Sequence, residues 1–542
     1  MDAVLDTLPD DADALKAMVL SMRAETARML EETGARQAEL AARDAEIAAL
    51  QAEHDRLVAL NERLEHIVAQ LQRLKFGPRS EKLDPDQLQL GLEDLEQACA
   101  AVEAEEEKHD SQLKAHRTRQ RRAERPSLPA HLPRVEVTIE PQTTACPCCT
   151  GAMVRIGEDI GERLDVVPAQ YRVIVTRRPK YACRACEEIV QAPAPARLIE
   201  GGLPTERLVA EVMTAKYADH LPLYRQSQRF KRQGIEIDRG TLAFWSGYAA
   251  AELKPLWALM RDELLATDHL FADETTAPVL DPGRGRTKTG WFWSIARDER
   301  GWGGTGPPAV VYTYAPGRGA EHATALLKDF EGVLQTDGYG VYKALAAKGE
   351  AIVLAHCWAH ARRKFFEIAA KGPAPIASEA LVKIARLYEI EAEVRGQDPA
   401  RRLAARQARS AQILEELKAW LEARLGELSG GSPTAKAIRY ALGHWQGLTR
   451  FLGDGRIELD TNPIERAMRP IALNRKNALF AGSDEGAEHW AVIATLVECC
   501  KLHDVNVADY LADILTSLVN LWPNSRLAEL TPWAWKAANP RA

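Results

Sequence analysis

Two short apolar segments that each carry an aspartate constrain this chain more than any other feature. The stretch from His269 to Tyr339 opens with HLFADETTAPVL and closes with GVLQTDGYGVY, and we expect a strand in each, with Asp273 and Asp337 at the strand exits. Between them, KTGWFWSIARD and AVVYTYAPGRG are aromatic and β-branched runs separated by Gly/Pro-rich turns, which predicts two more strands. Two carboxylates on neighbouring strand ends indicate a divalent-metal site that still needs a third acid.

The order of the expected elements indicates how the two aspartates could meet. Three strands are followed by a helix at AEHATALLKDF, the strand at GVLQTDGY, a fifth strand at AIVLAHC and a helix at WAHARRKFFEIAA. This is the order of a ribonuclease-H-like α/β sheet, in which the first and fourth strands lie side by side at the centre. We therefore predict a core of this kind over residues 266–370 and 455–485, with Asp273 beside Asp337.

A third carboxylate follows much later in the chain. Asn462-Pro463 begins a helix, because proline is tolerated in the first turn, and Glu465 lies in that turn. We predict Glu465 as the third ligand, with Asp460 as the alternative. Taken singly, such residues also serve as turn residues or complement a helix dipole. Together, two aspartates and a glutamate suit Mg²⁺ (or Mn²⁺), and paired ions of this kind cleave phosphodiesters.

Nine cysteines, partly grouped in CxxC pairs, favour reduced thiols and metal over disulfides. Two pairs would supply the four thiolates of a tetrahedral Zn²⁺ site in a zinc-ribbon-like domain over residues 131–195. Cys148 is a spare that could replace one member, and four unrelated free cysteines are the alternative. The predicted zinc ligands are Cys146, Cys149, Cys183 and Cys186.

Residues 13–76 contain no proline and predict one long helix. Leu50, Leu57, Leu64 and Leu71 recur every seven residues, and Asn61 falls at a neighbouring core position, which is typical of a parallel two-stranded coiled coil. We therefore expect a homodimer, although an amphipathic helix packed on its own chain would show a similar stripe. The start of the chain lacks the basic and apolar pattern of a secretory signal, and no apolar run is long enough to span a membrane. These features predict a cytoplasmic protein without membrane contact.

The remaining segments are predominantly helical or charged. In residues 203–260, a helix, a turn at Gln233-Gly234 and a second helix capped by Asp238 match a helix-turn-helix, a pattern that many helix pairs without DNA contacts share. The run LKAHRTRQRRAER is either a solvated tether or a phosphate clamp. The chain of 542 residues thus predicts a multidomain α+β protein. Its other segments are a charged linker at 77–130, a helical insertion at 375–450 and a C-terminal helical segment at 486–535.

Basic residues and two histidines lie near the predicted acids. We expect His356 and His360 to pack around the acids rather than react, although Cys357 with the two histidines could also bind metal. The net charge of −7 hides local basic patches, and such patches matter more for DNA binding than the sum. The predicted phosphate contacts are Arg362, Arg363, Lys364, Arg466, Arg469, Arg475 and Lys476.

Four motifs carry a family resemblance: DETTAP, QTDGYGVY, AHCWAHARRKFFE and NPIERAMRPIALNRKNALFAGS. They resemble those of the large transposase subunit of the insertion-sequence-66 family of bacterial transposases, and the similarity covers nearly the whole chain. The family is assigned to the Asp-Asp-Glu transposases with a ribonuclease-H-like core. The resemblance implies that Asp273, Asp337 and Glu465 are the metal ligands. Thr461-Asn462 stands where family members often have Asn-Asn, a departure that does not touch the acids.

The resemblance also implies a reaction. A transposase of this type nicks DNA at the ends of its element and joins the 3′-hydroxyls to target DNA, with possible help from accessory proteins. Two alternatives remain at this stage. One is a ribonuclease-H-like nuclease or resolvase that cuts without joining, and the other is a non-catalytic, zinc-containing DNA-binding protein.

Overall fold

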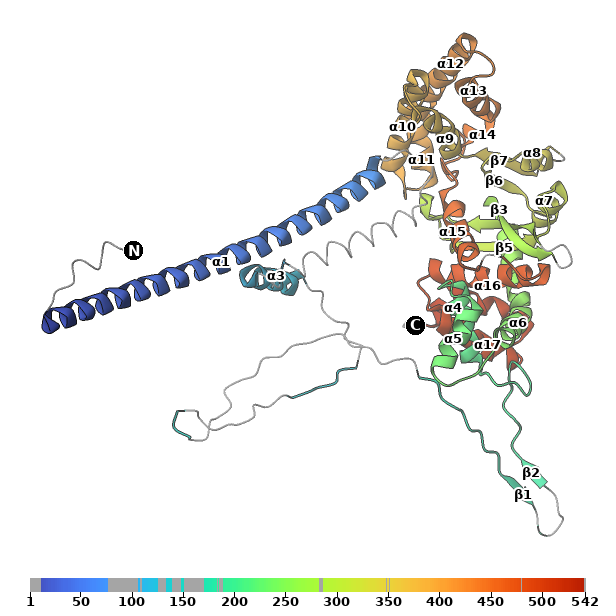
Figure 1. Cartoon of the computed structure of the whole chain (residues 1–542). Helices are drawn as coiled ribbons and strands as arrows, with labels where there is room; N and C mark the ends of the chain where they lie inside the picture. The colour runs from blue at the N-terminus through green and yellow to red at the C-terminus, as the bar shows by residue number, and fades with distance from the viewer. Residues whose placement is uncertain are drawn as a thin grey trace. The chain divides into compact units, whose positions relative to one another are not determined.

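The computed structural model describes residues 11–76, 106–107, 110–124, 133–138, 148–150, 170–182, 184, 189–281, 286–347, 349, 351–478 and 480–540. The chain divides into two units, Met1–Ile174 and Val175–Ala542. The second unit contains both β-sheets and all the predicted catalytic residues (Figure 1).

The first unit contains a long helix, α1 (Ala12–Phe76), and a short basic one, α3 (Ser111–Glu124). The predicted helix over 13–76 is thus confirmed, and it ends directly before Gly77-Pro78, which cannot continue it. Leu40, Ile47 and Leu50 of the heptad pattern are exposed along α1. The part of α1 where side chains are described thus presents exposed apolar residues at heptad positions.

A five-stranded sheet forms the centre of the second unit. Its order is β5-β4-β3-β6-β7, with β3, β4 and β5 antiparallel and β3, β6 and β7 parallel. The first and fourth strands of the sheet, β3 and β6, are therefore direct neighbours, as the element order predicts. The strands are β3 (His269–Asp281), β4 (Arg286–Arg297), β5 (Ala309–Ala315), β6 (Gly332–Thr336) and β7 (Ile352–His356).

Helix α16 (Asp484–Leu502) lies along β5, which is the edge strand of the sheet. The backbone N–H of Tyr312 donates to Thr495 Oγ1 at 3.0 Å, and the N–H of Val310 donates to Cys499 Sγ at 3.4 Å. These bonds satisfy strand donors that an open edge would leave free for another chain. Cys499 is thus a buried structural residue.

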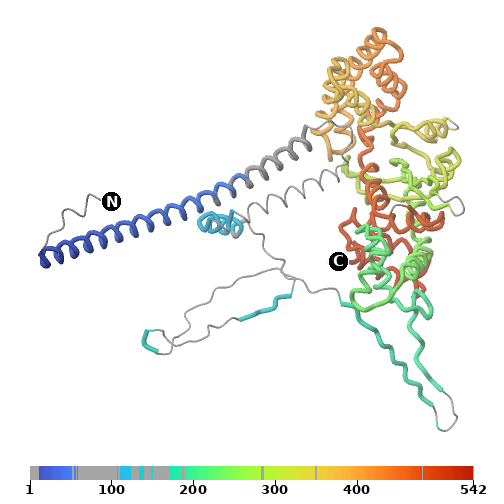
Figure 2. The backbone as a smooth tube through the Cα atoms, viewed as in Figure 1, coloured from blue at the N-terminus to red at the C-terminus, as the bar shows by residue number. Residues whose placement is uncertain are grey.

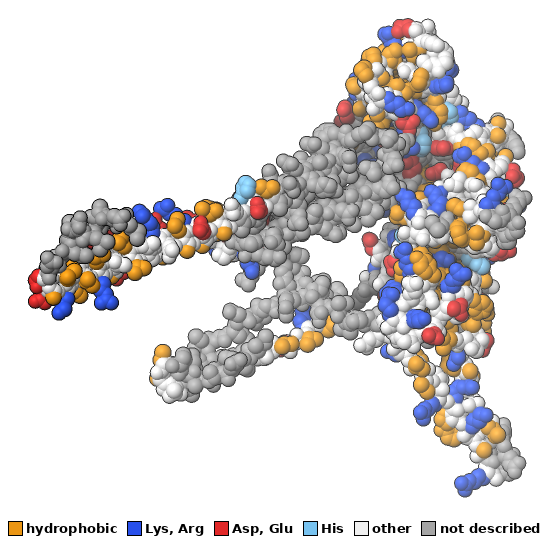
Figure 3. Space-filling view, in the orientation of Figure 1, with side chains coloured by type: hydrophobic (Ala, Val, Ile, Leu, Met, Phe, Trp, Pro, Cys, Tyr) orange, Lys and Arg blue, Asp and Glu red, His pale blue; other side chains and the backbone are white. Residues whose placement is uncertain are grey.

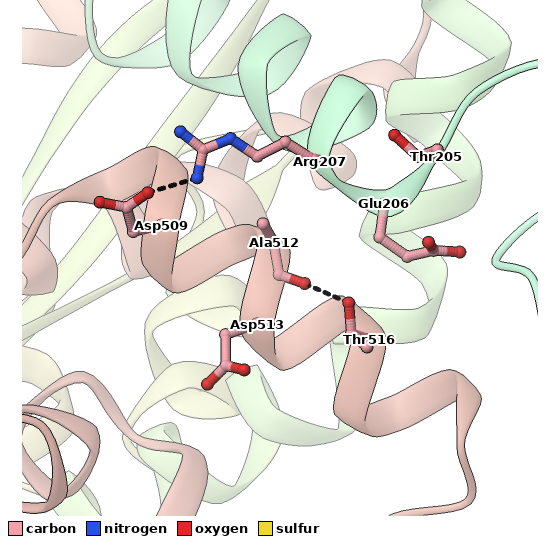
Figure 4. Close-up of a pocket in the computed structure, with 7 residues that line it drawn as sticks. All are labelled: Thr205, Glu206, Arg207, Asp509, Ala512, Asp513 and Thr516. Atoms are coloured by element: carbon pink, nitrogen blue, oxygen red, sulfur yellow. Dashed lines mark hydrogen bonds and ion pairs between the residues drawn. The ribbon is translucent and has the colours of Figure 1, made fainter. Parts of the chain in front are cut away.

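Helices that precede and helices that follow the predicted core in the chain pack into the same hydrophobic interior. The helices α4, α5 and α6 before β3, and α16, α17, η5 and α18 after the core, contribute to the same hydrophobic cluster as the sheet. Arg207 on α4 pairs with Asp509 on α17 beside the pocket shown in Figure 4. The helices α4 (Glu206–Tyr217), α5 (Leu223–Arg232), α6 (Arg239–Leu265) and α17 (Val507–Val519) form this layer, with η5 (Asn524–Leu530) and α18 (Pro532–Ala538) after them.

The predicted order of helix, turn and second helix is present in α5 and α6. The turn passes through Gly234, which adopts a positive φ of 74°, a conformation that glycine adopts without strain. Asp238 caps α6 by accepting a hydrogen bond from the Thr241 N–H at 2.9 Å. The long α6 then continues into the core of the unit.

The segment after α9 (Trp358–Ala369) forms a second, helical cluster with its own apolar centre. This cluster and the α4–α6 layer lie at opposite ends of the unit, with the sheet between them (Figure 2). Its elements are α10 (Pro375–Val394), α11 (Pro399–Ala405), η3 (Arg406–Ser410), α12 (Ala411–Glu427), α13 (Pro433–Gly443), α14 (Trp445–Leu448) and η4 (Arg450–Leu452). None of the helices in the described ranges is both long and apolar enough to cross a membrane.

The predicted zinc segment is described only in part. Strands β1 (Lys180–Ala182) and β2 (Ile189–Gln191) of this segment pair antiparallel, while residues 170–179 form no strand. Cys149 and the spare Cys148 are exposed. Cys146, Cys183 and Cys186 lie outside the described residues.

Candidate active site and metal centre

Asp273 lies in the middle of β3 and not at its exit, so that part of the prediction is wrong. The strand continues to Asp281 because its second half pairs with β4 and bridges to Ala481, far away in sequence. Pairing with β6, however, ends at Phe271. Asp273 therefore lies two residues beyond the last residue of β3 that pairs with β6, and Ser294 of β4 donates its hydroxyl to the Asp273 carbonyl at 3.1 Å.

Asp337 follows β6 directly, as predicted. Its Oδ1 accepts the backbone N–H of Tyr339 at 2.8 Å, which fixes the carboxylate at the start of the turn. Its carbonyl oxygen accepts the hydroxyl of Tyr440 at 2.7 Å, from helix α13 of the second cluster. The second cluster thus holds the backbone that carries Asp337.

Glu465 lies in the first turn of α15 (Asn462–Ala478), as predicted. The segment before α15 is bound to the start of α9. The N–H of Trp358 donates to the Leu459 carbonyl at 3.0 Å, and the N–H of Thr461 donates to Cys357 Sγ at 3.3 Å. From there α15 packs on β3, the strand that carries Asp273. These contacts bring the late glutamate back to the sheet.

The three carboxylates interact electrostatically. Burial, together with the negative charges of Glu274, Asp337 and Glu465, raises the pKa of Asp273 to about 8. Neighbouring carboxylates that share a partly buried site resist simultaneous ionisation. The hard oxygen donors and the excess negative charge suit a divalent cation, although the ligand atoms of the three acids do not all lie within 4.8 Å of one another in this structure.

The raised pKa of Asp273 makes the stability of the metal-free protein depend on pH. A carboxyl group whose folded pKa lies above its unfolded value favours folding at low pH, and stability falls as pH rises from about 4 to about 8. We expect the wild-type protein to lose on the order of 1–3 kcal/mol of its free energy of unfolding across this window. Asp273→Asn should not show this loss, because an amide does not ionise. Thermal melting of both proteins with a chelator, at pH 5 and pH 8, measures the difference. Parallel pH profiles of the two proteins would contradict this expectation.

Glu274, next to Asp273, supports the opposite face of β3. It is buried, accepts hydrogen bonds from Arg318 Nε and the Tyr342 hydroxyl at 2.9 Å each, and thereby joins β3 to α8 (Gly340–Ala346). Arg318 in turn stacks over the Tyr339 ring, with its Cζ atom 3.7 Å from the centroid. None of the residues of this cluster is among the predicted site residues. The alternation of a strand would have indicated that adjacent acids serve different faces.

The two histidines have different surroundings. His360 Nδ1 lies 3.6 Å from Glu465 Oε1, so His360 is adjacent to a predicted acid. His356 instead packs against the His444 ring, 5.0 Å between centroids, and burial lowers the pKa of His356 to about 3. His444 contacts the Gly338 carbonyl at 3.3 Å, so His356 reaches the Asp337 turn only through another side chain.

Asp460, the alternative third ligand, accepts hydrogen bonds from the backbone and side chain of Asn462 at 3.1 and 2.6 Å. Both of its carboxylate oxygens are therefore engaged at the start of α15. The electrostatic contacts of Asp273 include Glu465 among their largest and not Asp460. This favours Glu465 over Asp460.

Most of the predicted phosphate-contacting residues are exposed: Arg362, Arg363, Lys364, Arg466, Arg469 and Lys476. Arg475 instead donates to the Thr276 backbone and, at 2.9 Å, to its hydroxyl, which fastens α15 to β3. Arg363 lies 3.9 Å from Glu465 Oε2. Figure 3 shows Lys and Arg side chains distributed over the visible face of the second unit.

The chain matches a known protein family over the region that contains the three acids. Residues 201–489, more than half of the chain, match the family described as Transposase IS66 family. The chain belongs to the IS66 family of transposases. The match contains Asp273, Asp337 and Glu465, so these acids lie within a transposase-type catalytic domain. Transposases act on DNA, and the family therefore implies DNA binding.

Three further matches lie outside residues 201–489 of this IS66-family chain. Residues 143–187 match the zinc-finger binding domain of transposase IS66, which supports zinc in the segment of the predicted cysteine ligands. Residues 63–137 match a segment described as Transposase C of IS166 homeodomain, which spans the whole predicted linker and the end of the predicted coiled-coil helix. Residues 495–533 match the IS66 C-terminal element.

Relatives of similar length occur in Sinorhizobium fredii. The uncharacterized protein y4qI is 44% identical over 98% of this chain and 98% of its own length. The uncharacterized protein y4jD is 46% identical over 87% of this chain and 94% of its own.

Proposed function

We propose that this transposase nicks DNA at the ends of an insertion sequence and joins the freed 3′-hydroxyls to target DNA, with Asp273, Asp337 and Glu465 as its catalytic carboxylates. The observation that carries the proposal is the position of these acids. Asp273 lies on β3, Asp337 directly follows the adjacent strand β6, and a helix packed on β3 carries Glu465. The strand order supports assigning the core to the ribonuclease-H-like fold.

In this proposal the three carboxylates hold Mg²⁺ or Mn²⁺. Such an ion, when bound, would supply activation of the attacking oxygen and stabilisation of the leaving one. The chain itself orients the ligands. The Tyr339 N–H holds one oxygen of Asp337, the Tyr440 hydroxyl holds the Asp337 backbone, and the Thr461 hydroxyl donates to Glu465 Oε1 at 3.2 Å. Because such chemistry depends on positioning and charge neutralisation, no side chain needs to act as a covalent nucleophile.

The exposed cations beside Glu465 would contact the DNA backbone. Arg362 and Lys364 are exposed on α9, and Arg466 and Arg469 are exposed on α15, the helix that carries Glu465. Cations around an acidic centre attract a polyanion to the place where it is cut. We further propose that Cys146, Cys149, Cys183 and Cys186 bind Zn²⁺ and that α5 and α6 contribute to DNA recognition.

A homodimer through α1 completes the proposal. Leu40, Ile47 and Leu50 are exposed on a helix of 65 residues, and a second α1 would cover this stripe. Two copies of the chain would also hold the two ends of an element together, which paired joining requires.

The test uses purified full-length protein, Mg²⁺ or Mn²⁺, and labelled DNA that carries the terminal repeats flanking its gene. We expect nicks at the repeat ends and strand-joining products with a second DNA, both abolished by chelator. Nicking without joining would instead favour the nuclease or resolvase. Specific DNA binding without nicks under any divalent metal would favour the non-catalytic reading.

A further inference from the structure

Three potential metal ligands converge at the junction of α9 and α15. Cys357 precedes α9, His360 lies in its first turn, and Glu465 lies in the first turn of α15. One ligand atom from each of the three lies within 4.8 Å of the other two. His360 Nδ1 lies 3.6 Å from Glu465 Oε1.

The surrounding contacts fix this convergence in place. The Trp358 N–H donates to the Leu459 carbonyl, and the Thr461 N–H donates to Cys357 Sγ, so both chain segments are bound at the cluster itself. A backbone N–H that points at sulfur also stabilises a thiolate. His360 Nδ1 is buried and has no hydrogen-bond partner in the described part of the chain. A cation bound jointly by this ring nitrogen, the carboxylate and the thiol would give the buried nitrogen a partner.

We propose that Cys357, His360 and Glu465 form a second metal site, selective for Zn²⁺, that shares Glu465 with the carboxylate site. A thiolate, an imidazole and a carboxylate are ligands that Zn²⁺ accepts in three-residue sites with one open position. Mg²⁺ avoids sulfur and prefers oxygen. One thiolate and one carboxylate also balance the charge of the ion. On binding, the thiol proton of Cys357 leaves to solvent as the Zn–S bond forms.

The distances suit this ion after a small closure. Ligand bonds of about 2.0–2.3 Å place tetrahedral ligand atoms roughly 3.3–3.8 Å apart. The Nδ1 to Oε1 distance of 3.6 Å is already in that range, and the remaining pairs lie within 4.8 Å. The ion pair of Glu465 with Arg363 is long, at 3.9 Å, and Arg363 is half exposed, so it competes weakly.

Sharing Glu465 has a functional consequence, which rests on the proposed function. Zn²⁺ bound through Oε1 would draw Glu465 toward α9 and away from Asp273 and Asp337. The Mg²⁺-dependent reaction would then lose its third ligand. The site therefore makes the transposase sensitive to inhibition by zinc.

The first experiment measures bound zinc per chain in the full-length protein after equilibration with excess Zn²⁺ and gel filtration. We expect Cys357→Ser to hold one zinc fewer than wild type, because serine keeps an acceptor for the Thr461 N–H and supplies no thiolate. His360→Gln should show the same loss. The matched control is Cys500→Ser, a buried cysteine on α16 outside the cluster, which should match wild type. Zinc in the predicted ribbon is common to all four proteins and cancels in the comparison.

Equal zinc content in wild type, Cys357→Ser and His360→Gln would overturn the site, whatever the DNA reaction does. The second experiment titrates Zn²⁺ into Mg²⁺-supported nicking. We expect Cys357→Ser to need at least about tenfold more Zn²⁺ than wild type for half-inhibition, relative to its own uninhibited rate. The same inhibition curve for both proteins would overturn the shared role of Glu465. An extra zinc in a wild-type protein that never nicks DNA would support the metal site and count against the proposed function alone.

Discussion

Asp337→Asn is expected to lower metal-dependent DNA nicking by about a thousandfold or more. Loss of a metal ligand removes several kcal/mol of charge stabilisation, and each 1.36 kcal/mol or so corresponds to a factor of ten in rate. Asparagine keeps an oxygen that accepts the Tyr339 N–H at the position of Oδ1, so the turn after β6 should persist. The measurement is the single-turnover nicking rate on terminal-repeat DNA at saturating Mg²⁺.

Glu331→Gln is the matched control for this substitution. Glu331 is exposed immediately before β6, at the opposite end of the strand from Asp337, and the same carboxylate-to-amide change there should leave nicking within about twofold. Melting temperature and DNA affinity of both variants separate a catalytic loss from misfolding. If Asp337→Asn nicks at the wild-type rate, Asp337 does not bind the catalytic metal.

The order of the sheet was predictable because each of its strands carries a strong local pattern. Apolar and β-branched runs mark all five strands. The order of the strands along the chain, with one helix between the third and the fourth, restricts how β3 and β6 can pair. Asp337 was also placed correctly, since GVLQT ends at a turn signal directly before Asp-Gly. Local sequence thus fixes both a strand and its exit when a turn residue follows.

Asp273 shows where local sequence is insufficient. The polar residues of DETT suggest a strand end, yet β3 runs on to Asp281 because β4 pairs along its whole second half and Ala481 bridges to Val279. Both partners are distant in sequence, and a single strand carries no record of them. The length of a strand depends on its neighbours as well as on its own residues.

The supports of the site were missed for related reasons. Helix α8 has only seven residues, too few for a helical period to emerge, and it carries Tyr342, the partner of Glu274. Tyr440 belongs to a segment in which the sequence showed no chemistry, yet its hydroxyl holds the Asp337 carbonyl. Such contacts join elements that are distant in sequence and that only the folded core brings close together.

A buried ion network beside the site gives the second large expected effect, on stability. Arg402 is fully buried, and its guanidinium bonds Glu391 at 3.3 Å and Glu458 at 2.8 Å. Arg406, also fully buried, pairs with the same Glu391 at 2.7 Å. The backbone of Glu458 in turn bonds Gln335 of β6 at 2.8 and 2.9 Å. The network therefore joins the second cluster to the strand that delivers Asp337.

Arg402→Met is expected to destabilise the protein by about 3–5 kcal/mol, because it leaves two partly buried carboxylates with too few partners. Urea unfolding at neutral pH measures the change. Arg401→Met is the matched control, since Arg401 is the exposed neighbour in the same helix and its 3.4 Å pair with Asp398 lies in solvent, where removal should cost no more than about 0.5 kcal/mol. Equal stability of the two variants would mean that Glu391 and Glu458 are neutralised without Arg402. A further outcome is that Arg402→Met alone loses much of its free energy of unfolding and also nicks DNA more slowly under conditions where it is folded. That result would mean that the buried arginine also sets the position of the segment that leads to Glu465.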